Sequence, residues 1–214
     1  KAVAKVNEMK PDAVVFTGDQ VNRHYDSEQW DSFAEVISAI DPSVEVLHIP
    51  GNHDVMISEG TVDSGPFTDR YGDDRFLLCE RGVRLVGINS NLIKYDDPRE
   101  TEQLEWMKDA LKKKDASEVS LLFSHHPFFL KEIGEDDGYF QIQKSKRQTY
   151  FDLCAESDVD ALYAGHLHNN SSGEYSGMPV RTTTSVAFQI GDAQPSIRVI
   201  TIADGVISDR LLNI

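Results

Sequence analysis

Four short segments of this chain carry polar residues that suit metal binding or catalysis. They read GDQVN (18–22), GNHD (51–54), SHHP (124–127) and GHLH (165–168), and they contain five of the seven histidines. Their candidate residues are Asp19, Asn52, His53, Asp54, His125, His126, His166 and His168. Imidazole, carboxylate and amide donors in one set suit the first-row metals zinc, iron and manganese. One carboxylate among several histidines also suits two adjacent ions, because a single aspartate can bridge both, and such a pair can clamp a phosphate and activate a water.

Each of these segments follows an apolar run that is typical of a buried strand. The runs are AVVFT (13–17), VEVLHIP (44–50), VSLLF (119–123) and VDALYA (159–164). Helical periodicity separates them, over residues 27–40, 100–114 and 145–157. This alternation predicts an α/β fold, in which the carboxyl ends of the strands gather at one edge. We therefore expect the four polar segments to form one shared site.

Two further patterns predict antiparallel structure. Residues 75–79 and 83–89 read as the strands of a hairpin. The tail from Gly173 onward has short strands joined by glycine-containing turns, which predicts an antiparallel meander.

Composition limits the class of protein. The 214 residues are 40% hydrophobic, which suits one domain over 1–214. The formal net charge of −15 does not favour a nucleic-acid partner, since such proteins usually present a basic face. No apolar run approaches the length of a membrane helix, so we expect no membrane partner. The two cysteines, Cys79 and Cys154, lie far apart in no metal-like spacing, which favours a reducing compartment and a cytoplasmic location.

The first residues open within a helical pattern. KAVAKVNEMKPD has no initiator Met, and Val3, Val6 and Met9 share one face of a helix that no capping residue precedes. In an α/β protein a strand usually precedes such a helix. We expect that an upstream strand is missing from this sequence.

The four segments, in this order, resemble the motifs of the calcineurin-like metallophosphoesterases. GNHD and GHLH together with an ordered GD and an HxP form a highly specific combination. EIGEDDGYFQIQKSKR (132–147) is also similar to the branch called calcineurin-like phosphoesterase domain-containing proteins, or complete-S-transactivated proteins. The resemblance implies a four-layer α/β/β/α sandwich of two mixed sheets flanked by helices. It also implies hydrolysis of phosphate monoesters, because that branch is described as protein serine/threonine phosphatases.

The resemblance further implies a role for each residue. Asp19 would bridge two metal ions (Mn, Fe or Zn). Asn52, His125 and His166 would complete the second metal position, and His168 would join Asp19 at the first. His53 would be the general acid, with Asp54 orienting its imidazole, while a metal-bridging hydroxide attacks the phosphorus in line.

The family's first motif does not occur in this sequence. It is an Asp-x-His, or Asp-x-Gln in the similar branch, and it lies on the strand that precedes the first helix. We therefore expect the first metal position to be incomplete, with only Asp19 and His168, and activity to be reduced.

Some alternatives stay open. The same metal core could serve a phosphodiesterase acting on cyclic nucleotides or other small diesters, or the chain could be a catalytically impaired scaffold. The sequence does not name the phosphorylated substrate or the oligomeric state. We expect His126 to face away from the ligands, because side chains alternate along a strand. The long connection over 127–145 suggests a functional loop, in which Glu135, Asp136 and Asp137 could either select a basic peptide or only solvate the loop.

Overall fold

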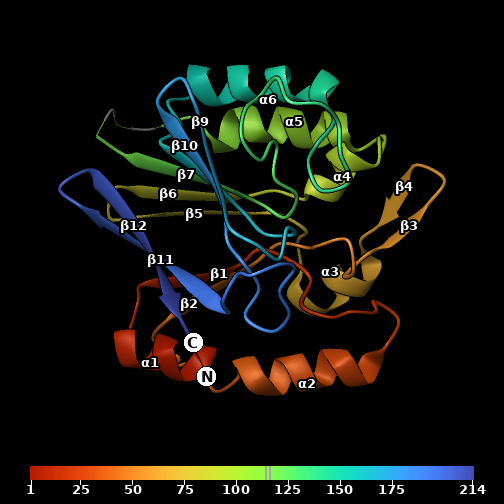
Figure 1. Ribbon diagram of the computed structural model, residues 1–214, viewed down its shortest axis with the longest axis vertical. Coiled ribbons are helices and arrows are strands. Elements are labelled where there is room, and N and C mark those ends of the chain that lie inside the picture. Colours follow the sequence, from red (N-terminus) through yellow and green to blue (C-terminus); the bar gives the residue numbers. More distant parts are fainter. Residues whose placement is uncertain (114, 116) are drawn as a thin grey trace.

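A six-stranded mixed sheet forms the centre of the fold (Figure 1). The computed structural model describes residues 1–113, 115 and 117–214. The sheet order is β5-β6-β7-β8-β10-β9, in which β6, β7, β8 and β10 run parallel, while β5 and β9 pair antiparallel at the two edges. The strand bounds are β5 Phe76–Glu80, β6 Val83–Gly87, β7 Val119–Ser124, β8 Ala161–Ala164, β9 Ser171–Tyr175 and β10 Met178–Thr182.

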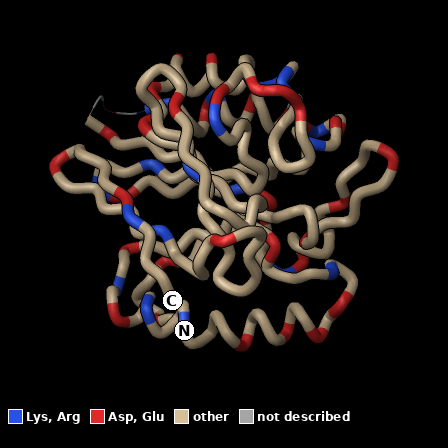
Figure 2. The backbone as a smooth tube through the Cα atoms, in the orientation of Figure 1, with Lys and Arg blue, Asp and Glu red and all other residues tan. Residues whose placement is uncertain are grey.

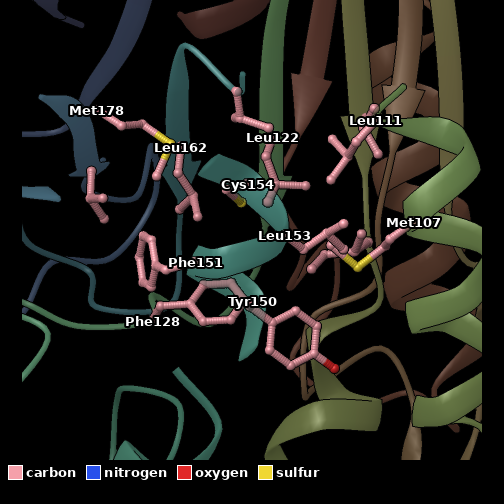
Figure 3. Close-up of a cluster of buried hydrophobic side chains, with 14 of the residues drawn as sticks. Met107, Leu111, Leu122, Phe128, Tyr150, Phe151, Leu153, Cys154, Leu162 and Met178 are labelled. Atoms are coloured by element: carbon pink, nitrogen blue, oxygen red, sulfur yellow. The ribbon is translucent and has the colours of Figure 1, made fainter. Parts of the chain in front are cut away.

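Helices cover one face of this sheet (Figure 1). They are α4 Ser90–Lys94, α5 Glu100–Ala110 and α6 Lys144–Glu156. Figure 3 shows the apolar cluster in this layer, where Met107 and Leu111 from α5 and the turn after it meet Phe151 of α6 and Leu122 of β7. β7 is buried along its whole length because its side chains alternate between this cluster and a second cluster on the opposite face.

The opposite face of the sheet packs on a second layer of strands. Parallel β1 Ala13–Phe16 and β2 Glu45–His48 form one pair, and antiparallel β11 Ser196–Ala203 and β12 Val206–Asn213 form another. Val15, Ile200 and Ile207 from this layer pack against Leu121 and Phe123 of β7.

Helices α1 Ala2–Met9 and α2 Ser27–Ile37 lie outside that strand layer (Figure 1), with Val6 and Ile37 packed against Val14 and Val46. The four-layer α/β/β/α architecture is therefore confirmed. The second strand layer consists of two separately paired strand pairs rather than one continuous sheet.

A hairpin and a short helix lie between β2 and β5 in the chain. The hairpin consists of β3 Met56–Ser58 and β4 Thr61–Asp63, and helix α3 Gly65–Tyr71 follows it. Asp97 ties the hairpin to the body of the protein, since its carboxylate accepts a hydrogen bond from the backbone N–H of Val62 at 2.7 Å.

Most predicted elements are present. The four apolar runs are β1, β2, β7 and β8, and the hairpin over 75–89 is β5 and β6. The helix predicted over 100–114 ends at Ala110, and residue 114 lies outside the described residues. The predicted meander of the tail is wrong. β9 and β10 join the six-stranded sheet, whereas β11 and β12 pair with each other in the second layer, because the apolar residues of the two hairpins belong to the clusters on opposite faces of the six-stranded sheet.

Charged residues are dispersed over the surface. The sequence has 36 acidic and 21 basic residues, and the Lys and Arg coloured in Figure 2, those of the described part of the chain, form no continuous stripe in this view. Among the described residues, every helix is too short or too polar to cross a lipid bilayer.

Candidate metal centre

The four polar segments meet at the carboxyl ends of β1, β2, β7 and β8, where two glycines allow the loops to approach closely. Gly18 has a φ of +97°, which only glycine adopts easily. A Cβ atom on Gly51 would lie 2.1 Å from Oδ1 of Asp19, and one on Gly18 would lie 2.5 Å from Nδ1 of His125. The glycines of the GD and GNHD segments are therefore needed to bring Asp19, Asn52 and His125 together.

His125 lies at the centre of the donor set. Its Nε2 atom is 3.3 Å from Oδ2 of Asp19, 3.1 Å from Oδ1 of Asn52 and 3.0 Å from Nδ1 of His166. Its Nδ1 atom is 2.7 Å from the carbonyl oxygen of Thr17. A carbonyl only accepts hydrogen bonds, so Nδ1 carries the proton and, in neutral His125, Nε2 presents a lone pair to the other three donors.

This arrangement fits a divalent metal ion. Ligand bonds of about 2.0–2.2 Å at tetrahedral or octahedral angles place neighbouring ligand atoms about 3–3.5 Å apart. The separations around Nε2 of His125 fall in that range. When His125 is neutral, the lone pairs of these four atoms face one another and a cation between them is favourable; a carboxylate, an amide oxygen and two imidazoles are the donors that zinc, iron and manganese accept. Asp19, Asn52, His125 and His166 are thus the residues that would hold one ion.

The electrostatics of the cluster put Asp19 and His166 in the forms that bind a metal. Although burial opposes this, Asp19 raises the pKa of His125, so a metal ion would have to displace the proton from Nε2 of His125. Burial alone would raise the pKa of Asp19, but His125 beside it keeps that pKa well below its usual range. Burial, assisted by the positive charge of protonated His125, lowers the pKa of His166 to about 3. At neutral pH Asp19 is therefore ionised and His166 is neutral, as metal binding requires.

The backbone at three of the candidate ligands is left-handed. Asp19, His166 and His168 have φ angles of 57°, 61° and 51°. Such angles are uncommon outside glycine, and they concentrate at functional sites where the surrounding structure holds them in place. Here the left-handed residues follow the ends of β1 at Phe16 and of β8 at Ala164, where the backbone leaves the extended path of each strand.

His53 lies at the exposed edge of the cluster. Its backbone N–H donates to Oδ1 of Asp19 at 2.9 Å, which fixes it beside the donor set. Its Nδ1 atom donates to the carbonyl oxygen of Asn22 at 3.0 Å, so Nε2 is the ring nitrogen that can give a proton to a substrate. Asn22 was not among the predicted site residues, because a backbone carbonyl leaves no signature in side-chain identity.

Asp54 has a different role from the one expected. Its fully buried carboxylate accepts hydrogen bonds from the backbone N–H groups of Asp19 at 2.7 Å, Gly51 at 2.8 Å and Val21 at 3.1 Å. The carboxylate is directed into the loops and not toward the His53 ring, so the prediction that Asp54 orients that imidazole is corrected. Burial and the neighbouring Asp19 raise the pKa of Asp54 to about 7. Asp54 ties the GD segment to the GNHD segment.

The remaining histidines flank the donor set. Nδ1 of His168 donates to the carbonyl of Phe188 at 2.6 Å, which leaves its Nε2 for a ligand role. His126 does not face away from the cluster, as its ring centroid lies 4.4 Å from that of His166. The alternation of strand side chains stops because β7 ends at Ser124. The Nδ1 atom of His126 lies 3.0 Å from the hydroxyl of Ser90.

The acidic residues of the loop before α6 are largely used within the loop itself. Glu135 accepts from the backbone N–H groups of Leu130 and Lys131, and Asp137 accepts from that of Lys144. Asp136 is fully exposed, with Nζ of Lys144 at 3.8 Å. Two of the three carboxylates that could have selected a basic peptide therefore stabilise the loop.

Comparisons with known proteins agree with the fold and show the family. The family described as Calcineurin-like phosphoesterase matches residues 1–170. A Bos taurus relative, serine/threonine-protein phosphatase CPPED1, is 30% identical over 98% of this chain and 71% of its own length. A Rhodococcus erythropolis relative, a probable cyclic nucleotide phosphodiesterase, is 25% identical over 84% of this chain and 58% of its own length. The structure of purple acid phosphatase PPD1 from yellow lupin superposes with a TM-score of 0.75 at 16% identity, over 98% of this chain and 46% of that one.

The four-layer fold with a strand-end cluster of carboxylate, amide and imidazole donors defines a metal-dependent hydrolase of phosphoric esters. The chain belongs to the calcineurin-like phosphoesterase family, whose match covers most of its length and includes all four polar segments.

Proposed function

We propose that the chain hydrolyses phosphate monoesters, with phosphoserine or phosphothreonine in proteins as the substrate class. The observation that supports this proposal best is the placement of His53 beside four metal donors. His53 is fixed to Asp19 through its backbone N–H, while Asp19, Asn52, His125 and His166 surround one point. The similarity to the Bos taurus serine/threonine-protein phosphatase favours a phosphoprotein substrate.

The roles of the residues follow from their contacts. Asp19, Asn52, His125 and His166 would hold one ion, and His168 with Asp19 would contribute to a second. When bound, Mn, Fe or Zn ions neutralise phosphate charge and make water a better nucleophile at neutral pH. Nε2 of His53 gives its proton to the leaving oxygen of the ester, and the carbonyl of Asn22 at Nδ1 holds the ring in the orientation that presents Nε2.

The first test compares three esters under controlled metal. We expect turnover of p-nitrophenyl phosphate with Mn²⁺, loss of turnover with a chelator, and slower turnover of bis-p-nitrophenyl phosphate. His53→Ala should lower kcat by about 100-fold or more on phenyl phosphate, whose leaving group needs a proton, and by less on p-nitrophenyl phosphate. An equal effect on both monoesters would contradict the general-acid role.

A phosphodiesterase is the second candidate, and the similarity to the Rhodococcus erythropolis relative favours it. Faster turnover of the bis-ester than of the monoester would put this candidate first. A chain that binds Mn²⁺ but turns over neither ester would be the catalytically impaired scaffold.

A further inference from the structure

Two exposed aromatic rings stand directly beside the histidines of the GHLH segment. Tyr139 is 70% exposed, and its ring centroid lies 5.7 Å from that of His166 with the ring planes 30° apart. Phe188 is 64% exposed, and its ring lies 5.4 Å from that of His168. Aromatic rings that stand on a surface are enriched where one protein binds another.

The backbone that carries Tyr139 is held on both sides. Nζ of Lys94 donates to the carbonyl of Gly138 at 3.2 Å and to that of Gln141 at 2.5 Å. Fully buried Arg147 donates to the carbonyls of Ile133 and Ile142 at 3.0 and 2.9 Å. The Tyr139 ring is thus presented to solvent by a fixed loop.

Phe188 is presented in the same way. Its carbonyl accepts from Nδ1 of His168, its N–H donates to the hydroxyl of Ser185 at 3.3 Å, and the N–H of Ile190 donates to the carbonyl of His168 at 3.0 Å. An exposed ring on a fixed backbone loses little conformational entropy when it binds a partner, and such preorganisation strengthens binding.

The position of the two rings beside the donor set indicates which part of a substrate would contact them. A phosphate that reaches the donor set lies next to His166 and His168, so the groups attached to that phosphate meet Tyr139 and Phe188. In a peptide, consecutive Cα atoms are about 3.8 Å apart, so residues one or two positions from a phosphoserine lie roughly 4–8 Å away. The ring centroids of Tyr139 and Phe188 lie 5.7 and 5.4 Å from those of His166 and His168, so side chains within this reach of the phosphoserine can contact both rings.

We propose that Tyr139 and Phe188 select phosphoserine or phosphothreonine segments that carry apolar side chains next to the phosphorylated residue. This inference rests on the proposed function and names its substrate class. A nucleotide is less favoured, because the neighbouring loop adds the fully exposed carboxylate of Asp136 and the chain as a whole is strongly acidic. Recognition of the peptide thus depends on contact with the two aromatic rings rather than on Glu135, Asp136 and Asp137 of the loop.

The test uses two phosphoserine peptides of equal length. One has leucine on both sides of the phosphoserine, and the other has glycine there. We expect wild-type protein with Mn²⁺ to prefer the leucine peptide about tenfold in kcat/KM. Tyr139→Ala and Phe188→Ala should each remove most of that preference, mainly through a higher KM. Val206→Ala is the matched control, since Val206 is 67% exposed on β12, and it should keep the wild-type preference.

The outcomes separate this inference from the function on which it rests. If p-nitrophenyl phosphate is not hydrolysed, the proposed function fails and the inference fails with it. If p-nitrophenyl phosphate is hydrolysed but the leucine peptide is no better than the glycine peptide, only the inference is overturned. A preference that persists in both variants also overturns it. An equal loss on both peptides, with a lower melting temperature, would assign the rings a structural role and overturn it as well.

Discussion

Asp54 holds two loops of the donor set together, so its removal should cost stability out of proportion to its size. Its buried carboxylate accepts three hydrogen bonds from the backbone N–H groups of Asp19, Gly51 and Val21. A buried donor that loses its partner costs about 1–3 kcal/mol. Asp54→Ala leaves three such donors, and some water entry is expected, so the free energy of unfolding should fall by about 3–5 kcal/mol.

The free energy of unfolding of the isosteric variant Asp54→Asn should lie between those of wild type and Asp54→Ala. Asp54→Asn keeps one oxygen, and the better orientation of the amide places it where the N–H groups of Asp19 and Gly51 converge on a single oxygen. Only the N–H of Val21 then lacks an acceptor, which predicts a loss of about 1–3 kcal/mol. Metal affinity should fall by about 10–100-fold in Asp54→Ala, which loses the hydrogen bond from the N–H of Asp19, and by less in Asp54→Asn, which keeps it.

Urea unfolding with a chelator present measures these losses without a contribution from bound metal. The midpoints should decrease in the order wild type, Asp54→Asn, Asp54→Ala, with unchanged m-values. Asp41→Asn is the control, since the carboxylate of Asp41 also accepts a backbone hydrogen bond, from Ser43, but at an exposed turn where water can replace it. A loss below about 1 kcal/mol for Asp54→Ala, or an equal loss at Asp41, would refute the reasoning.

Three further predictions follow from buried groups. Burial lowers the pKa of His48 to about 4 from 6.5, so the unfolded chain binds a proton at higher pH than the folded chain does. The free energy of unfolding should therefore fall as the pH drops from 6.5 to 4, by up to about 3 kcal/mol. Urea unfolding of His48→Phe should show a flatter pH dependence over this range than that of wild type, and an equally steep one would contradict this prediction. Arg147→Met removes the donor to three loop carbonyls, so hydrogen exchange should speed up over residues 131–142 and stay unchanged in β7, whereas equal acceleration in both would show global destabilisation. Mn²⁺ at about 100 times its Kd should raise the free energy of unfolding by about 2.7 kcal/mol, and His125→Ala should abolish this increase; an increase that survives the substitution would place the ion elsewhere.

The convergence of the site could be predicted from the sequence because it follows from strand order. Each polar segment comes directly after an apolar run, and the carboxyl ends of those runs meet at one edge. Glycine at positions 18 and 51 then allows the loops to touch. Residue types and chain topology were sufficient for this part, and Asp19, Asn52, His125 and His166 lie together as expected.

The contacts within the site could not be predicted in the same way. The partner of His53 is the backbone carbonyl of Asn22, and every residue has such a carbonyl. Asp54 follows His53 in sequence, yet its carboxylate is directed to amides of the loops, since burial without those amides would be costly. His126 stays near the cluster because β7 ends at Ser124, so the alternation of strand side chains does not extend to it. In all three cases the contact depends on the path of the loop backbone, which residue types alone do not specify.

The sequence pattern also did not predict that the two C-terminal hairpins belong to different sheets. The two hairpins, β9–β10 and β11–β12, each have a glycine-containing turn, so the tail reads as one meander. What separates them is the layer against which each apolar face packs. Val180 of β10 joins the cluster under α5 and α6, while Ile200 of β11 joins the cluster beneath β7. Packing partners of this kind are long-range, and local pattern does not reveal them.

The central claim is that Asp19, Asn52, His125 and His166 form a metal site, and equilibrium dialysis with Mn²⁺ tests it most directly. Wild-type protein should retain at least one ion per chain after dialysis against low free metal. His125→Ala should retain it at least tenfold more weakly, whereas His24→Ala, which removes a histidine outside the donor set, should bind like wild type. Unchanged Mn²⁺ retention in His125→Ala, or none in wild type, would contradict the account.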